Sequence, residues 1–274
     1  MASEPLILAV ETSSRIGSVA MAKGARLLGQ STFSASLRHS AEIFPAIASL
    51  LDRFGQTPAD IAQIHISIGP GSFTGLRIAV AAAKSMHLAG SAQIVTVDSL
   101  DTIAANLTDA ATDSSIQDNR QDRLRPDRVA TILDAKRGQF FVAVYERTSP
   151  DEQLRPQTED PGYRIPAAPG GLWRKVLPDC LMNAGEFLDR FASESNPVAV
   201  LGDGLLHHRD SFKANGVRIL DEACWSPHAV QVHRLGYQKA QAGRFADPLT
   251  LTPFYLRRPQ VTLRKNATPT ANSP

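Results

Sequence analysis

A strand pattern, a turn of glycine and proline, and a small-residue helix follow one another directly in the first half of the chain. Residues 64–68 alternate partly like a strand, and residues 74–89 form an alanine-rich helical pattern that stops at Gly90. Glycine permits positive φ and close backbone approach, and proline stiffens a turn. The segment therefore predicts a strand-to-helix elbow, capped by Ser72 or Thr74, whose helix start is a candidate anion site. A tight, well-capped turn without a ligand is the simpler interpretation. The elbow consists of Gly69, Pro70, Gly71, Ser72, Phe73, Thr74 and Gly75, followed by Leu76 and Arg77.

Apolar runs and helical periodicity alternate through the rest of the chain. The expected strands are 6–10, 17–21, 26–33, 93–97, 129–133, 139–145 and 198–201, and the expected helices are 36–54, 99–106, 182–192 and 226–243. The helix at 36–54 carries two apolar stripes, which predicts cover from its own sheet and from something else. Ser226 is expected to be the N-cap of the last helix and Pro227 its first residue. Both halves begin with strand, turn and strand, and this indicates two related α/β halves.

The small positive charge belongs to the end of the chain. Of 29 Lys+Arg and 27 Asp+Glu, residues 257–274 hold four basic and no acidic side chains, which leaves a net charge of −2 on residues 1–256. The body is therefore not an obvious polyanion binder. Two cysteines cannot form a disulfide framework, no apolar run approaches a membrane span, and the first residues lack a signal-peptide pattern. A cytoplasmic protein without a membrane partner is expected.

The elbow sequence GPGSFTGLR resembles the signature of the TsaB (YeaZ-type) family, a subunit of the bacterial tRNA threonylcarbamoyladenosine (t6A) machinery. The resemblance covers most of residues 6–107 and short stretches through 258. Further segments that resemble the family, in order, are LILAVETSS at 6–14, LRHS at 37–40 with Phe44-Pro45, VDSL at 97–100, ILDAKR at 132–137 and PFYLR at 253–257.

This resemblance implies an actin-like, sugar-kinase-like (ASKHA) fold, an α/β fold of two related domains with a cleft between them. The expected domains are residues 1–107 and residues 108–258, with the helix at 226–243 packing back towards the first domain. Residues 259–274 are expected to be a flexible tail, and residues 108–128 and 149–179 carry little regular signal.

Many members of this fold bind ATP, so a nucleotide cleft has to be considered residue by residue. Nucleotide-using members offer an acidic, glycine-bearing phosphate turn from each domain. The turn that follows residues 6–10 lacks a glycine, and the turn at 134–138 has one glycine, which disfavours a competent ATP site. The candidate nucleotide-cleft residues are Glu11, Thr12, Ser13, Asp134, Gly202, Asp203 and Gly204. An ATPase or kinase of the same fold is the alternative function.

No metal set or nucleophile stands out in the sequence. TsaD, the catalytic paralogue that this family resembles, holds its metal with two histidines at i and i+4, whereas here His39 is followed by Ile43. No base can be placed next to Ser72, and neither cysteine has a neighbouring histidine in the sequence. No catalytic residue, metal or cofactor is therefore expected, and a glycoprotease-like peptidase is the less favoured alternative.

Partner binding is the function that the sequence favours. The resemblance implies that the helices at 36–54 and 74–89 pair with equivalent helices of a TsaD-like catalytic subunit, or of a second copy when that subunit is absent. The expected role is that of a non-catalytic subunit needed for threonylcarbamoyl transfer to the N6 of the adenosine 3′ of the anticodon. A TsaE-like ATPase is the third partner, and tRNA is bound mainly through the complex. The expected interface residues are His39, Ile43, Phe44, Ile47, Leu76, Arg77, Val80, Ala83, Lys84 and His87.

Overall fold

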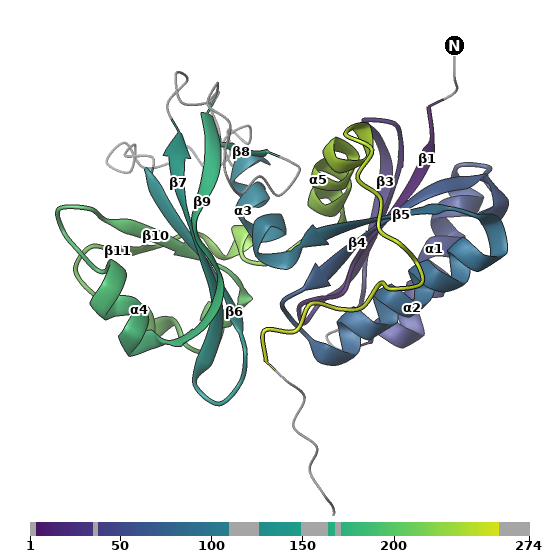
Figure 1. Cartoon of the computed structure of the whole chain (residues 1–274). Helices are drawn as coiled ribbons and strands as arrows, with labels where there is room; N and C mark the ends of the chain where they lie inside the picture. The colour runs from purple at the N-terminus through teal and green to yellow at the C-terminus, as the bar shows by residue number, and fades with distance from the viewer. Residues whose placement is uncertain (1–3, 35–37, 110–125, 149–163, 168–170, 258–274) are drawn as a thin grey trace, which may run out of the picture.

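The computed structural model contains two β-sheets that lie side by side (Figure 1). It describes residues 4–34, 38–109, 126–148, 164–167 and 171–257. Residues 110–125, 149–163, 168–170 and 258–274, on which several expectations about loops and the tail fall, lie outside the described residues. In the described parts, no helix has the length and apolar character needed to cross a membrane.

The first sheet has five strands in the order β3-β2-β1-β4-β5. Its strands are β1 (Leu6–Glu11), β2 (Ser18–Lys23), β3 (Arg26–Thr32), β4 (Ile61–Gly69) and β5 (Gln93–Asp98). β1, β2 and β3 form an antiparallel meander, whereas β4 and β5 run parallel to β1. β1 is buried along its whole length, which explains its unbroken apolar run.

The second sheet repeats this topology. Its order is β11-β10-β6-β7-β9-β8, in which β6, β7 and β9 form the meander and β10 and β11 run parallel to β6. The two related halves indicated by the sequence are thus visible in the strand order itself. The strands are β6 (Arg128–Asp134), β7 (Gln139–Thr148), β8 (Ile165–Ala167), β9 (Gly171–Asn183), β10 (Val198–Leu201) and β11 (Val217–Ile219).

Helices cover the first sheet on both faces. α1 (His39–Arg53) and α2 (Phe73–Gly90) share a core with one face, and α5 (Ala229–Gln241) packs on the other face against β1, β2, β4 and β5. α3 (Ser99–Asp109) leaves β5 and joins the core of the second sheet, whereas α4 (Ala184–Phe191) lies near β9. The core around α3 also contains residues of the first sheet and of α5, so it runs continuously through both halves.

A buried ionic cluster lies where α3 meets the second sheet. The Lys175 ammonium of β9 is 2.6 Å from Asp101 of α3, 2.7 Å from Asp179 and 3.6 Å from Asp98 at the end of β5. The Tyr145 hydroxyl of β7 donates to Asp101 at 2.6 Å. Burial raises the pKa of Asp98 and that of Asp179, and the three carboxylates raise the pKa of Lys175 against the effect of its burial. One cation therefore links residues of both halves.

Several element boundaries differ from the sequence expectation. α5 begins at Ala229 after the N-cap His228, because the Ser226 carbonyl accepts the Asn106 amide of α3 at 2.7 Å and holds this residue outside the helix. α4 begins at Ala184, where Asn183 and Glu186 form a capping box. The expectation of little regular structure in 149–179 is wrong for residues 165–167 and 171–179, which belong to β8 and β9. β7 supplies hydrogen-bond partners for β9, which in turn pairs with β8, and a local pattern does not report such pairing.

The predicted strand-to-helix elbow joins β4 to α2, and Ser72 is its cap. The Ser72 side chain accepts the Gly75 amide at 3.3 Å, and the Ser72 amide donates to the Ser13 carbonyl at 2.7 Å. Gly75 approaches β1 so closely that a Cβ there would lie 1.8 Å from the Thr12 carbonyl oxygen. Gly69, the last residue of β4, and Gly202, the residue after β10, lie at the ends of equivalent strands of the two sheets, and both have a φ of 129°.

The substitution Gly75→Ala tests this backbone contact. Gly75→Ala places a methyl group against the Thr12 carbonyl, and neither backbone segment can yield cheaply. We expect a loss of about 2–4 kcal/mol in the free energy of unfolding, measured by urea denaturation. The matched control is Gly90→Ala at the end of the same helix, where no atom lies within 4 Å of the added Cβ. The control should stay within about 1 kcal/mol of the parent. Equal stabilities of the two variants would contradict the close approach.

Candidate functional site

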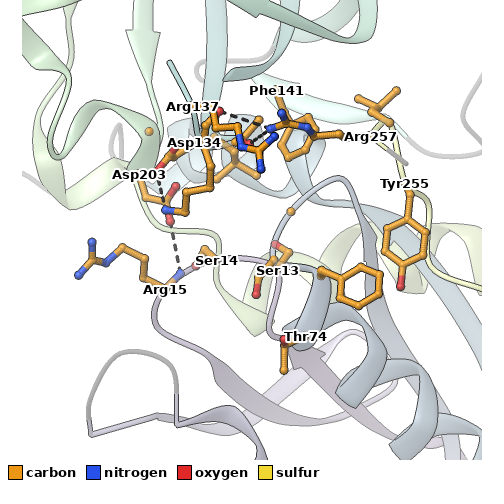
Figure 2. A pocket seen from close by; sticks show the side chains of 18 of the residues that line it. Ser13, Ser14, Arg15, Thr74, Asp134, Arg137, Phe141, Asp203, Tyr255 and Arg257 are labelled. Atoms are coloured by element: carbon orange, nitrogen blue, oxygen red, sulfur yellow. Dashed lines mark hydrogen bonds and ion pairs between the residues drawn. The ribbon is translucent and has the colours of Figure 1, made fainter. Parts of the chain in front are cut away.

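A cleft of about 630 Å³ lies between the two sheets (Figure 2). Its walls are the turn after β1, the elbow before α2, the turn between β6 and β7, and the segment after β10. A fifth wall is the chain at 254–257, which runs back along the first sheet (Figure 1). Equivalent turns of two related sheets thus face each other across one cavity.

The first wall rests on a buried carboxylate. Glu11 is fully buried and accepts hydrogen bonds from the Ser13 amide, the Ser13 hydroxyl and the Ser67 hydroxyl. Burial raises the pKa of Glu11, although the hydrogen bonds from Ser13 and Ser67 oppose this shift. Glu11 therefore fixes the turn that carries Ser13 into the cleft, while its own carboxylate lies behind the wall.

Charged side chains line the two walls that the second half contributes. Asp134 pairs with Lys136, whose ammonium lies 2.6 Å from one carboxylate oxygen and whose backbone amide lies 2.7 Å from the other. Burial acts to raise the pKa of Asp134, but these contacts outweigh it and keep the pKa below its ordinary value. Asp203 accepts the Arg15 amide at 3.4 Å, and the Arg15 guanidinium lies 2.7 Å from the His207 ring. These contacts of Arg15 connect the two halves at the mouth of the cleft.

The segment at 254–257 closes one side of the cleft. The Phe254 amide donates to the Ile68 carbonyl at 2.8 Å, and the Arg257 guanidinium donates to the Ala135 carbonyl at 2.8 Å. The Tyr255 ring stacks on Phe73 at the start of α2, with ring centroids 5.1 Å apart. The segment is thus anchored to both halves by its own backbone and side chains.

The predicted elbow and the predicted nucleotide cleft, which are separate in the sequence, line one cavity in the structure. The elbow residues 71–74 line the same cavity as Ser13, Asp134, Asp203 and Gly204. The other three predicted cleft residues lie behind the walls. Glu11 holds Ser13, the Thr12 hydroxyl donates to the Gly75 carbonyl, and Gly202 lies against Ile132, where a Cβ would be 2.1 Å from the carbonyl oxygen.

Sequence reasoning missed much of the lining of this cleft. The side chains that line the cleft come from several segments that are far apart in the chain, and no local pattern marks them. The unpredicted lining residues include Arg15, Lys136, Arg137, Phe141, His207, Phe254, Tyr255 and Arg257. The only available signal was the resemblance of residues 132–137 and 253–257 to the family, which marks two of these segments without assigning a role.

Most of the predicted interface residues are buried within this chain. His39 is 3% exposed, and its Nε2 lies 3.0 Å from the Ser14 carbonyl, so it supports the turn after β1. Phe44 and Arg77 are exposed, and Lys84 and His87 are partly exposed. The residues of this set that are open to solvent therefore lie on the outward faces of α1 and α2. The buried members of the predicted set are His39, Ile43, Ile47, Leu76, Val80 and Ala83.

The candidate nucleophiles have structural roles or an unfavourable environment. The Ser72 hydroxyl caps α2. Burial raises the pKa of the Cys180 thiol and that of the Cys224 thiol, which disfavours the reactive thiolate. Within the described ranges, no group of three or more His, Cys, Asp or Glu side chains could hold a metal ion.

The strand orders and the cleft define the class of protein. Two sheets that share the order and directions of five strands, equivalent glycine turns and a cavity between the sheets make an actin-like, sugar-kinase-like α/β fold, as predicted. The structure resembles that of YeaZ from Pseudomonas aeruginosa with a TM-score of 0.67. The matched region covers 92% of this chain and 100% of the YeaZ chain, with 20% sequence identity.

Comparison with known sequences confirms the predicted resemblance to the TsaB (YeaZ-type) family. The chain is 28% identical over 254 residues to the tRNA threonylcarbamoyladenosine biosynthesis protein TsaB of Bacillus subtilis (92% of this chain, 93% of that protein). It is 24% identical over 258 residues to TsaB of Escherichia coli (92% and 94%). A model of the TsaD family, tRNA N6-adenosine threonylcarbamoyltransferase, matches residues 33–158.

The cleft carboxylate Asp203 predicts a pH dependence of stability. Burial, reinforced by the nearby Asp134, raises the pKa of Asp203 to about 6 from 3.8, against the effect of Arg15. The native state therefore holds this proton more tightly than the unfolded chain does. The favourable contribution is present below about pH 4 and is lost as the pH rises through about 6.

Asp203→Asn should remove this dependence. Relative to the parent, the variant should gain about 1–2 kcal/mol in the free energy of unfolding between pH 4 and pH 7.5, measured by urea denaturation at both values. Asp247→Asn is the comparison. Hydrogen bonds from Leu249 and Thr250 lower the pKa of Asp247, so the stability of this variant relative to the parent should change with pH in the opposite direction. A difference between Asp203→Asn and the parent that stays constant with pH would refute the assignment.

Proposed function

We propose that this chain is a non-catalytic subunit in tRNA t6A biosynthesis that binds a TsaD-like catalytic subunit through α1 and α2. The resemblance over nearly the whole chain to proteins named for this pathway supports the role in t6A biosynthesis. The observation that carries the binding mode is a stripe of small and apolar side chains on the outward faces of the two helices.

On α1 the stripe consists of residues that lie opposite its buried face. Ala41, Phe44 and Ala48 are exposed, and 53% of the Phe44 surface is open to solvent. Ile43 and Ile47, on the other stripe, are buried in the core with the sheet. The two apolar stripes recognised in the sequence therefore have different roles, and the exposed one has no cover within the described residues of this chain.

On α2 the exposed residues recur at helical spacing. Arg77, Ala81, Ser85 and Leu88 point outward, and 82% of the Leu88 surface is open to solvent. Small residues at the centre of such a face let another helix approach within about 8–10 Å. Exposed apolar side chains on two neighbouring helices favour a protein partner. The same surface can join two copies of this chain when the catalytic subunit is absent.

The carboxylates at the cleft favour a supporting role over catalysis. Glu11 is committed to Ser13 and Ser67 behind the wall, and Asp134 is paired with Lys136. The transfer of the threonylcarbamoyl group is therefore assigned to the TsaD-like partner, and ATP hydrolysis to a TsaE-like third component. This chain contributes the surface on which the catalytic subunit is held.

A charged side chain in the exposed stripe should weaken partner binding strongly without affecting folding. Ala81→Arg introduces a long cation at the centre of the α2 face, where the facing helix has to desolvate it. We expect at least a tenfold loss of affinity for the cognate TsaD-like subunit, measured by isothermal titration calorimetry. The thermal midpoint of unfolding should stay within a few degrees of the parent, because the side chain points to solvent.

The matched control is Ala242→Arg, at the exposed C-terminal cap of α5 on the other face of the sheet. It makes the same chemical change and should bind the partner like the parent. Unchanged affinity of Ala81→Arg would rule out the helix interface. A parent chain that does not bind the TsaD-like subunit at all would overturn the proposed function.

A further inference from the structure

We propose that the mouth of the cleft is a contact surface for RNA, in which an unpaired base stacks on the exposed aromatic rings and the adjoining phosphates bind the surrounding cations. The inference rests on the proposed function in one respect: a t6A subunit meets tRNA as the substrate of its complex. The surface itself follows from the exposed rings and the cations that line the cleft (Figure 2).

Two aromatic rings, those of Phe73 and Tyr255, stack at one edge of the cleft. Phe73 is 42% exposed, and Phe254, which precedes Tyr255 in the closing segment, is 44% exposed. The Phe73 ring centroid lies 5.1 Å from that of Tyr255 and 5.3 Å from the Arg77 guanidinium carbon. Aromatic rings and guanidinium groups are the side chains on which unpaired bases stack in complexes with single-stranded nucleic acids.

Cations line the cleft from three separate segments. Lys136 and Arg137 come from the turn after β6 and Arg257 from the closing segment, whereas Arg15, from the turn after β1, lies on the side away from Tyr255 (Figure 2). The Lys136 side chain is 74% exposed even though it pairs with Asp134. Arg257 holds the Ala135 carbonyl with one guanidinium nitrogen. A guanidinium has five N–H donors, so this one can also bind a phosphate oxygen.

The charge balance of the cleft favours a polyanion. Four cations line it against the carboxylates of Asp134 and Asp203. With four cations and two carboxylates these groups keep a net charge of +2 even when both carboxylates are ionised. Arg257 is also the first of four basic residues, with no acidic ones, in residues 257–274. An acidic peptide could satisfy the cations, but it would leave the open aromatic rings unused, which is why RNA is the better occupant.

The test is a fluorescence anisotropy titration of a labelled RNA hairpin with a seven-base unpaired loop, at several salt concentrations. The full chain is used alone and in complex with its TsaD-like partner. Lys136→Ala should weaken binding about three- to tenfold and lower the log–log salt slope by about 1, since one phosphate contact is lost. Tyr255→Ala should weaken binding by a similar factor with an unchanged salt slope, and Tyr255→Phe should retain most of the affinity.

Two further variants sharpen the test. Asp203→Asn removes a negative charge from the mouth and should tighten RNA binding about twofold or more. Lys213→Ala is the matched control, because this lysine is exposed in the second half, is paired with Asp210 and is not part of the cleft lining. It should bind the hairpin like the parent.

Unchanged affinity and salt slope in Lys136→Ala and Tyr255→Ala would overturn the proposal. It would also be overturned if a fully paired RNA duplex bound as tightly as the hairpin, if polyglutamate competed as well as RNA, or if ATP alone displaced the hairpin at micromolar concentration. Partner affinity is measured in the same variants. A parent that binds RNA through the cleft but does not bind TsaD refutes the proposed function alone, and intact partner binding with no RNA effect refutes this inference alone.

Discussion

The close contact between the start of α2 and the end of β1 is the constraint on which the cleft depends. The Gly75 backbone lies against the Thr12 carbonyl, and the Ser72 amide donates to the Ser13 carbonyl. A side chain at position 75 would push the helix away, and the turn that carries Ser13 would lose its support. The buried Glu11 carboxylate holds this turn from behind. Helix start and strand end thus form one rigid wall.

The second half builds its wall in the same way, and this explains why two turns from distant parts of the chain can define one cavity. Gly202 approaches the Ile132 carbonyl, and Gly204 approaches the backbone at Asp134, as the elbow glycines approach β1. The two walls keep their relative position because the core around α3 is shared and because Lys175 binds carboxylates from both halves. Opening the cleft would separate these charges in a buried environment, which is energetically costly.

The sequence predicted the fold better than the site, for a physical reason. The elbow, the buried strands and the two apolar stripes of α1 are local patterns of one segment, and the structure contains them. Which stripe faces the sheet is not a local property, so Ile43 and Ile47 were expected at a partner surface although they belong to the core. The cations of the cleft come from segments around 15, 136 and 257, and only the folded topology brings them together. β9 was missed because its pairing with β7 outweighs its weak local signal.

α2 connects the two surfaces that the proposals assign. Its outward stripe from Arg77 to Leu88 is the surface proposed for the partner, and its first turn forms part of the cleft. The ring of Phe73 joins them, because it contacts Arg77 on the helix and Tyr255 on the closing segment. A partner helix that packs on Arg77 therefore touches the same stack that would receive a base. Since the backbone of the elbow cannot yield at Gly75, such a partner would meet a cleft whose shape is already set, and any substrate held there would lie directly beside the partner's own surface.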